Sequence, residues 1–208
     1  MQFTSVFDNQ TSENTYMIYD ENTLNGVIID PGCDIDKILK MINEKNVKVK
    51  YILLTHCHYD HIKSVSLLKE KTGADIVTGD NCSRNIKEKN INLSVYGLGY
   101  EISDINTDKI IKDNEILIID SLKIKCIYTP GHTDCSVCYI TENEIFSGDT
   151  LFLRSCGRWD LPTGDFDTIE KSIKEKLYKL SDDMNVHPGH GGKTTIGYEK
   201  KYNFCIKI

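Results

Sequence analysis

The histidines of this sequence are the residues whose type and spacing most clearly indicate chemistry. The chain has six of them, in three short groups: His56, His58 and His61, then His132, then His187 and His190. His56 and His58 are two residues apart, so in extended backbone their side chains project to the same side and can bind one cation. Asp60 and His61 follow where the chain is expected to turn into a helix, so they point in a new direction. The segment 55–61 therefore predicts ligands for two adjacent metal ions, and its imidazoles and carboxylate suit zinc, iron or manganese.

Three further candidate ligands each follow a predicted strand: His132 after Pro130-Gly131, Asp149 after Ser147-Gly148, and His190 after Pro188-Gly189. Pro-Gly marks a turn, so both histidines are expected on tight loops. Taken alone, each residue has an ordinary interpretation, as a polar turn, a cap at a strand end or a loop histidine. The ordered set H-x-H-x-D-H, G-H, G-D and G-H, with each part after a strand, favours the metal site.

Hydrophobic patterning predicts the elements that must position these residues. Short apolar or alternating runs predict strands, at 3–7, 15–19, 26–30, 49–54, 109–112, 115–120, 122–129, 136–141, 144–147 and 184–186. Helical spacing predicts helices at 35–42, 62–68, 83–89 and 166–180, with a long loop at 151–164. Strands and helix followed by strands and helix indicate two packed β-sheets with helices outside. We expect a single α/β domain over 1–208, built from two similar halves at about 1–115 and 116–208.

Length, charge and composition exclude several classes of protein. The chain has 208 residues and a formal net charge of −6, which disfavours a nucleic-acid or anionic-membrane partner. The first residues show neither the basic region nor the apolar stretch of a signal peptide. The apolar runs, such as 51–55, are too short to cross a bilayer. We therefore expect a cytoplasmic protein that contacts no membrane.

The eight cysteines are dispersed along the chain, which favours reduced thiols over a disulfide framework. Cys135 and Cys138 form a lone C-x-x-C in a strand-like run, where positions three apart face opposite sides. We interpret them as buried structural thiols, with a redox or zinc pair as the alternative. Cys57 lies between two candidate ligands, and the alternation of extended backbone turns its side chain away from them, into buried packing.

Taken together, these motifs resemble the metallo-β-lactamase superfamily, and within it glyoxalase II (hydroxyacylglutathione hydrolase) and its compact single-domain relatives. The supporting phrases are THCHYDH at 55–61, TPGHTDCSVCY at 129–139, FSGDTLF at 146–152, CGRWDLPTGD at 156–165 and HPGHGGKTTIG at 187–197. The resemblance implies a four-layer αββα sandwich with the metals at one edge of the two sheets. It also implies one ion on His56, His58 and His132, a second on Asp60, His61 and His190, and Asp149 as the bridge between them.

The same resemblance implies a hydrolase with two divalent metal ions, zinc first and iron or manganese as alternatives. Its small-molecule substrate would be a thioester or a related acyl compound, attacked at the carbonyl by a metal-bridging hydroxide. Asp60 would orient this hydroxide as the catalytic carboxylate. Thiolate is a good leaving group, so no strong general acid is required.

Arg158 lies where these enzymes carry a basic residue that meets a glutathione carboxylate, which implies a substrate-binding role. Its alternative is an ion pair with Asp160 or Asp165 inside the same loop. The residues after His190 lack the tyrosine of the glutathione enzymes, so the thiol carrier stays open. So do the oligomeric state and the role of His187, for which support of a metal ligand is one possibility.

Three other classes compete with the thioesterase. A non-haem iron oxidoreductase of the persulfide dioxygenase type shares the G-R-x-D phrase at 157–160, but the full second ligand set argues against its single iron. A tRNA 3′-end nuclease requires a basic RNA-gripping arm, which this acidic chain does not offer. A non-catalytic metal-binding protein would retain the ligands and show no hydrolase activity.

Overall fold

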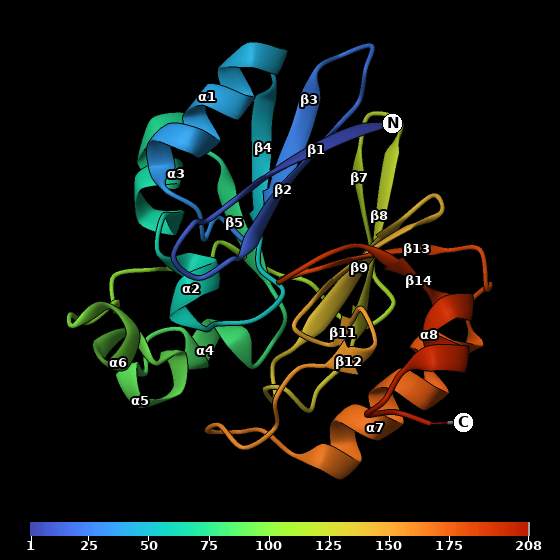
Figure 1. The fold of residues 1–208 in the computed structure, drawn as a ribbon. Helices are drawn as coiled ribbons and strands as arrows, with labels where there is room; N and C mark the ends of the chain where they lie inside the picture. Colours follow the sequence, from blue (N-terminus) through green and yellow to red (C-terminus); the bar gives the residue numbers. More distant parts are fainter. Residues whose placement is uncertain (208) are drawn as a thin grey trace.

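Two six-stranded sheets pack face to face in the computed structural model, which describes residues 1–207 (Figure 1). The N-terminal sheet has the order β1-β2-β3-β4-β5-β6. Its strands are β1 Gln2–Phe7, β2 Asn14–Tyr19, β3 Asn25–Ile29, β4 Lys48–Leu53, β5 Asp75–Thr78 and β6 Lys109–Ile110. The C-terminal sheet has the order β14-β13-β10-β9-β8-β7. Its strands are β7 Ile116–Ile119, β8 Leu122–Tyr128, β9 Val137–Thr141, β10 Glu144–Gly148, β13 Asn185–Pro188 and β14 Thr194–Thr195.

Helices cover the outer faces of both sheets (Figure 1). Those of the N-terminal half are α1 Ile35–Lys45, α2 Tyr59–Ile62, α3 Val65–Thr72, α4 Cys82–Asn85, α5 Lys89–Asn92 and α6 Ser94–Leu98. Those of the C-terminal half are α7 Phe166–Glu175, the 3₁₀ turn Leu177–Lys179 and α8 Ile196–Tyr202. A small hairpin, β11 Leu151–Phe152 with β12 Ser155–Cys156, lies beside the second sheet. The predicted αββα arrangement of two sheets flanked by helices is confirmed.

Three apolar layers follow from the alternation of side chains along the strands. In β2, Tyr16 and Ile18 face the space between the sheets, whereas Met17 faces the α1 and α3 side. Tyr139 and Phe146 of the second sheet complete the layer between the sheets. A third layer joins the second sheet to α7 and α8. Burying one such large apolar side chain stabilises the fold by roughly 1.5–3 kcal/mol.

Local signals mark the start of α1 and the end of α3, as the sequence predicts. Asp34 caps α1 by accepting a hydrogen bond from the backbone N–H of Asp36. Gly73 ends α3 at φ +69°, a left-handed conformation that glycine adopts without steric cost. The thiols also lie as expected: Cys57 is fully buried, and Cys135 and Cys138 are buried in different apolar layers.

Several element bounds differ from the prediction. The expected helix 83–89 is two short helices, because Glu88 between them is extended at φ −95° and ψ 100°. The helix expected to reach 180 ends at Glu175, and its last turn tightens into the 3₁₀ turn. β5 is not among the predicted strands. It has four residues and forms because it pairs in parallel with β4 and β6, which are distant in the sequence. The loop 151–164 contains the β11–β12 hairpin.

Strand direction gathers the candidate site at one edge of the sandwich. β3 and β4 run parallel, as do β10 and β13, and β8 shares the direction of β10 because each is antiparallel to β9. The candidate ligands follow the carboxyl ends of β4, β8, β10 and β13, and these ends meet at one edge, since His58 lies against His132 and His61 lies against His190 and Asp149. In residues 1–207 we find no helix with the length and apolarity that crossing a membrane requires.

Candidate metal centre

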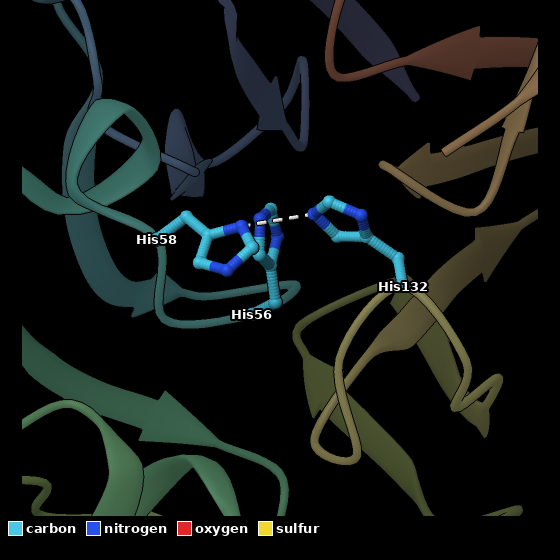
Figure 2. A group of neighbouring side chains, drawn as sticks. All are labelled: His56, His58 and His132. Carbon is cyan, nitrogen blue, oxygen red and sulfur yellow. Dashed lines mark hydrogen bonds between the residues drawn. The ribbon is translucent and has the colours of Figure 1, made fainter. Parts of the chain in front are cut away.

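Three histidines meet where the loop after β4 approaches the loop after β8 (Figure 2). The ring centroids of His56, His58 and His132 lie 4.7–4.9 Å apart. Nδ1 of His58 is 2.9 Å from Nε2 of His132. All three rings are buried, and each offers a nitrogen within 4.8 Å of the others. This group can hold one metal ion.

A second group lies beside the first and combines α2 with the loop after β13. Asp60 and His61 stand in the first turn of α2, and His190 follows Pro188-Gly189. Nε2 of His190 is 3.2 Å from Oδ2 of Asp60 and 3.3 Å from Nε2 of His61. The three donor atoms lie within 4.8 Å of one another and form a second candidate ligand set.

Asp149, which follows β10, lies between the two groups. Its Oδ1 is 3.3 Å from Nε2 of His61, and its Oδ2 is 3.6 Å from Nε2 of His132 and 3.7 Å from Nε2 of His190. One carboxylate therefore contacts donors of both groups. The structure brings together all seven residues that the sequence predicts as ligands, among them His61 and His190, which are 129 positions apart.

The local backbone explains how one segment serves both groups. His58 is extended at φ −66° and ψ 146°, and α2 begins at the next residue. His56 and His58 thus precede the helix, while Asp60 and His61 lie within it. Position 189 has room only for glycine, because a Cβ there would lie 2.3 Å from Oδ1 of Asp149 and 2.6 Å from Cε1 of His61.

In His56 and His132, the ring nitrogen that faces away from the centre has a polar partner. Nδ1 of His56 donates to Oγ1 of Thr55 at 3.0 Å, and Nδ1 of His132 donates to the carbonyl of Arg158 at 2.7 Å. Such bonds select the tautomer whose other nitrogen is free to bind a metal. Each of these two histidines accordingly directs Nε2 inward.

Two further residues support the second group, and the sequence reasoning missed both. Oδ2 of Asp30 accepts from Nδ1 of His61 at 2.9 Å, and the carbonyl of Thr11 accepts from Nδ1 of His190 at 3.1 Å. Asp30 carries one signal, since it ends a predicted strand directly before Pro31-Gly32. Thr11 contributes its backbone, so its residue type carries no signal.

Burial and charge divide the histidines into two kinds. Burial lowers the pKa of His56 well below its ordinary value and that of His58 to about 4, so both are neutral at pH 7. Burial also disfavours a proton on His61 and His190, but contacts with Asp149 and Asp60 raise the pKa of both. The pKa of the Asp149 carboxyl is lowered well below its ordinary value because the effect of its burial is outweighed by His61.

Unpartnered buried atoms show that the residues fit a cation. Among the described residues 1–207, three buried side-chain atoms lack a hydrogen-bond partner: Nε2 of His56, Nε2 of His58 and Oδ1 of Asp149. Buried polar atoms are almost always paired, and an unpaired one indicates a missing ion or water. Imidazole nitrogens and carboxylate oxygens are the donors that zinc, iron and manganese accept.

The comparisons with known proteins agree with this fit. The family model of the metallo-beta-lactamase superfamily matches residues 8–190. The chain belongs to the metallo-β-lactamase superfamily. This confirms the resemblance that the motifs carry.

Relatives within the superfamily cover nearly the whole chain. Hydroxyacylglutathione hydrolase GloC of Haemophilus influenzae is 34% identical in an alignment of 199 positions that covers 92% of this chain and 91% of that protein. The crystal structure of the B3 metallo-β-lactamase BLEG-1 has a TM-score of 0.91 at 30% identity and covers 98% of both chains. That of TTHA1623 in a di-iron-bound form has a TM-score of 0.84 at 28% identity, covering 97% of this chain and 98% of the other. The superfamily binds divalent metals, and these histidine-rich groups are the candidate site for them in this chain.

A cavity of about 490 Å³ opens onto the metal centre of this superfamily member. Besides ligands, its wall contains mostly apolar and aromatic side chains, with two small polar residues and one cation: Tyr59, Leu93, Phe152, Ser155, Cys156, Leu161 and Arg158. The cavity therefore admits a small molecule with an apolar part.

Arg158 lines the cavity and also forms an ion pair with Asp160. Its Nε and Nη2 donate to the two carboxylate oxygens at 2.7 and 2.8 Å, and both side chains are more than 60% exposed. The sequence left open a substrate contact and this internal pair. The pair is present, and the substrate contact stays a prediction.

His187 points away from the centre. Its Nε2 hydrogen-bonds a carboxylate oxygen of Glu144, and its ring stacks on Phe146 between β10 and β13. The contacts of His187 are thus those of the sheet core rather than of a metal ligand.

Proposed function

We propose that this protein is a dinuclear metal-dependent hydrolase whose substrates are thioesters of the hydroxyacylglutathione type. The observation that carries the proposal is the place of Asp149, with one carboxylate oxygen toward His61 and the other toward His132 and His190. His56, His58 and His132 would bind one cation, Asp60, His61 and His190 the other, and Asp149 both. The relative of Haemophilus influenzae, named for thioester hydrolysis, supports the substrate class.

Two divalent cations at this centre would polarise a substrate carbonyl and lower the pKa of water toward about 7. The carboxylate of Asp60 lines the cavity and is held toward the centre by Nε2 of His190. In the metal-free protein the pKa of Asp60 is lowered, because His61 and the hydrogen bond from His190 outweigh the effect of burial, so the carboxyl is ionised at pH 7. Asp60 can therefore accept a hydrogen bond from the attacking water and take its proton. The water's oxygen bonds to the acyl carbon, the C–S bond breaks, and the thiolate leaves.

The walls of the cavity and its mouth would bind the remaining parts of the substrate. Phe152 and Leu161 offer apolar surface to the acyl or thiol portion. Arg158 supplies the cationic side chain among the lining residues of the described chain 1–207, and a guanidinium suits a carboxylate. A substrate carboxylate would have to displace Asp160 from Arg158.

Elemental analysis of purified protein, paired with hydrolysis of a substrate panel, tests the proposal. The panel contains S-lactoylglutathione, a neutral thioester, a cephalosporin and, with an oxygen electrode, glutathione persulfide. We expect two equivalents of metal per chain and hydrolysis of the thioesters. One equivalent or fewer contradicts the dinuclear site, and turnover confined to the lactam or coupled to oxygen uptake contradicts the thioesterase.

A matched pair of variants tests the substrate contact. Arg158→Gln should raise KM for S-lactoylglutathione with kcat unchanged, and leave the neutral thioester unaffected. Asp160→Asn removes the competing carboxylate, so it should lower KM for the anionic substrate alone. Equal changes in KM for the anionic and the neutral substrate would show that Arg158 does not bind the substrate carboxylate.

A further inference from the structure

The loop between β1 and β2 holds His190, although the two are far apart in the sequence. The carbonyl of Thr11 accepts from Nδ1 of His190 at 3.1 Å, across 179 positions. Glu13 forms an antiparallel β-bridge with His190, and the backbone N–H of Asn14 donates to the carbonyl of Gly189 at 2.7 Å. The loop thereby sets the ring orientation that directs Nε2 of His190 toward Asp60 and Asp149.

Asp8 organises this loop from within. Its Oδ1 accepts hydrogen bonds from the backbone N–H of Gln10 at 2.8 Å, from that of Thr11 at 2.9 Å and from Oγ1 of Thr11 at 3.2 Å. Its backbone closes the loop, since its N–H donates to the carbonyl of Glu13 and its carbonyl accepts from the N–H of Ser12. Thr11, whose carbonyl accepts from His190, is thus bound to the Asp8 carboxylate through both its backbone N–H and its hydroxyl.

The other oxygen of Asp8 reaches the helix that carries the remaining ligands of the second group. Nζ of Lys63 donates to Oδ2 of Asp8 at 2.6 Å, with the side chains 17% and 6% exposed. Lys63 ends α2, two residues after His61. Burial alone would raise the pKa of the Asp8 carboxyl, but the bonds from Lys63 and the loop hold it well below its ordinary value. Asp8 is therefore an anion linking the loop under His190 to the helix bearing Asp60 and His61.

We infer that Asp8 is a positioning residue for the second metal ion, acting on His190 through the Thr11 carbonyl and on α2 through Lys63. The inference rests on the proposed function only in assuming that Asp60, His61 and His190 bind a cation. Partners that orient metal ligands typically contribute about 10–100-fold to metal affinity. The first group receives no contact from Asp8, so its affinity should not change.

The experiment titrates metal-free wild type and variants with Zn²⁺ and measures both stepwise affinities. Asp8→Ala removes the loop bonds and the ion pair, and should weaken the second Zn²⁺ by about 10–100-fold while the first is unchanged. Asp8→Asn retains an acceptor for the loop N–H groups and should restore part of this loss. Lys63→Met removes the ion pair alone and should resemble Asp8→Asn.

Asp20 offers a matched control at the other end of the sheet. It is also buried, and its Oδ1 accepts from the backbone N–H groups of Asn22 and Thr23 in the loop between β2 and β3. Asp20→Ala should lower the melting temperature as Asp8→Ala does, but keep both Zn²⁺ affinities. Retention of the second Zn²⁺ by Asp8→Ala, or its equal loss in Asp20→Ala, would overturn the inference.

Failure of the inference and failure of the proposed function are distinguishable. A wild type that binds one Zn²⁺ contradicts both. A wild type that binds two and hydrolyses no thioester contradicts the proposed function, while selective loss of the second Zn²⁺ in Asp8→Ala still supports the role of Asp8.

Discussion

Asp30 accepts a hydrogen bond from Nδ1 of His61 at 2.9 Å, with both side chains buried. The same carboxylate accepts from the backbone N–H of Thr55 at 2.7 Å and from its Oγ1 at 2.6 Å. Oγ1 of Thr55 in turn accepts from Nδ1 of His56. One carboxylate at the end of β3 therefore orients an imidazole of each ligand group.

Asp30→Asn should weaken the metal centre without removing any ligand. An amide has one acceptor oxygen, so its NH₂ group would face either the backbone N–H of Thr55, or both Oγ1 of Thr55 and Nδ1 of His61. We expect a loss of about 1–3 kcal/mol in unfolding free energy and about 10–100-fold weaker metal binding. Denaturant unfolding of the metal-free chain and Zn²⁺ competition measure the two effects. Unchanged Zn²⁺ affinity would show that His61 keeps its orientation unaided.

Gly189→Ala should abolish the second ligand group by steric conflict. The new Cβ would lie 2.3 Å from Oδ1 of Asp149 and 2.6 Å from Cε1 of His61, so one of them must move. Gly192→Ala is the matched control, because its Cβ would meet nothing within 4 Å. We expect Gly189→Ala to bind about one metal ion fewer than Gly192→Ala, by elemental analysis. Equal metal contents in the two variants would contradict the geometry.

The stability of the metal-free chain should pass through a maximum near pH 6.5. The pKa of His56 lies well below the ordinary 6.5, and that of His58 is lowered to about 4. Below pH 6.5 the unfolded chain therefore binds more protons than the folded chain, and stability decreases as the pH is lowered. The pKa values of His61 and His190 lie above 6.5, so their stabilisation is complete below pH 6.5 and is lost as the pH rises through the folded values. Thermal unfolding across pH 5–9 measures the curve.

Saturating Zn²⁺ should remove the decline on the alkaline side. The cation competes with the protons on His61 and His190, so binding strengthens as the pH rises and adds stability there. A metal-free chain whose stability keeps rising from pH 6.5 to 8 would show that these two imidazoles are already neutral.

Tyr139→Phe should weaken the contact between the sheets and leave the metal centre intact. Tyr139 is fully buried on β9, and its hydroxyl donates to the carbonyl of Leu54, beyond β4, at 3.0 Å. Removing the donor leaves a buried carbonyl unpaired, which costs about 1–3 kcal/mol. Tyr96→Phe, at a side chain 77% exposed, should change the unfolding free energy little. A loss of metal from Tyr139→Phe would instead tie sheet packing to the ligands.

Much of the fold follows from local pattern, and the exceptions have physical causes. Alternating and apolar runs predict most strands, and Asp34 and Gly73 mark helix ends by interactions within a few residues. β5 and the β11–β12 hairpin escape prediction because short strands are defined by their neighbours. The break at Glu88 is a backbone conformation that any residue type adopts, so its sequence carries little signal.

The sequence by itself determined the ligand types and their local directions. The spacing of His56 and His58 before a helix that carries Asp60 and His61 is a property of extended and helical backbone alone. Only the tertiary structure decided which donors meet. His58 faces His132 across 74 positions because the carboxyl ends of β4 and β8 share one edge of the sandwich. Asp30 contacts His61, which is 31 positions away, and Thr11 contacts His190, which is 179 positions away. Hydrogen bonds between residues so far apart in the sequence exist only once the sheets have packed.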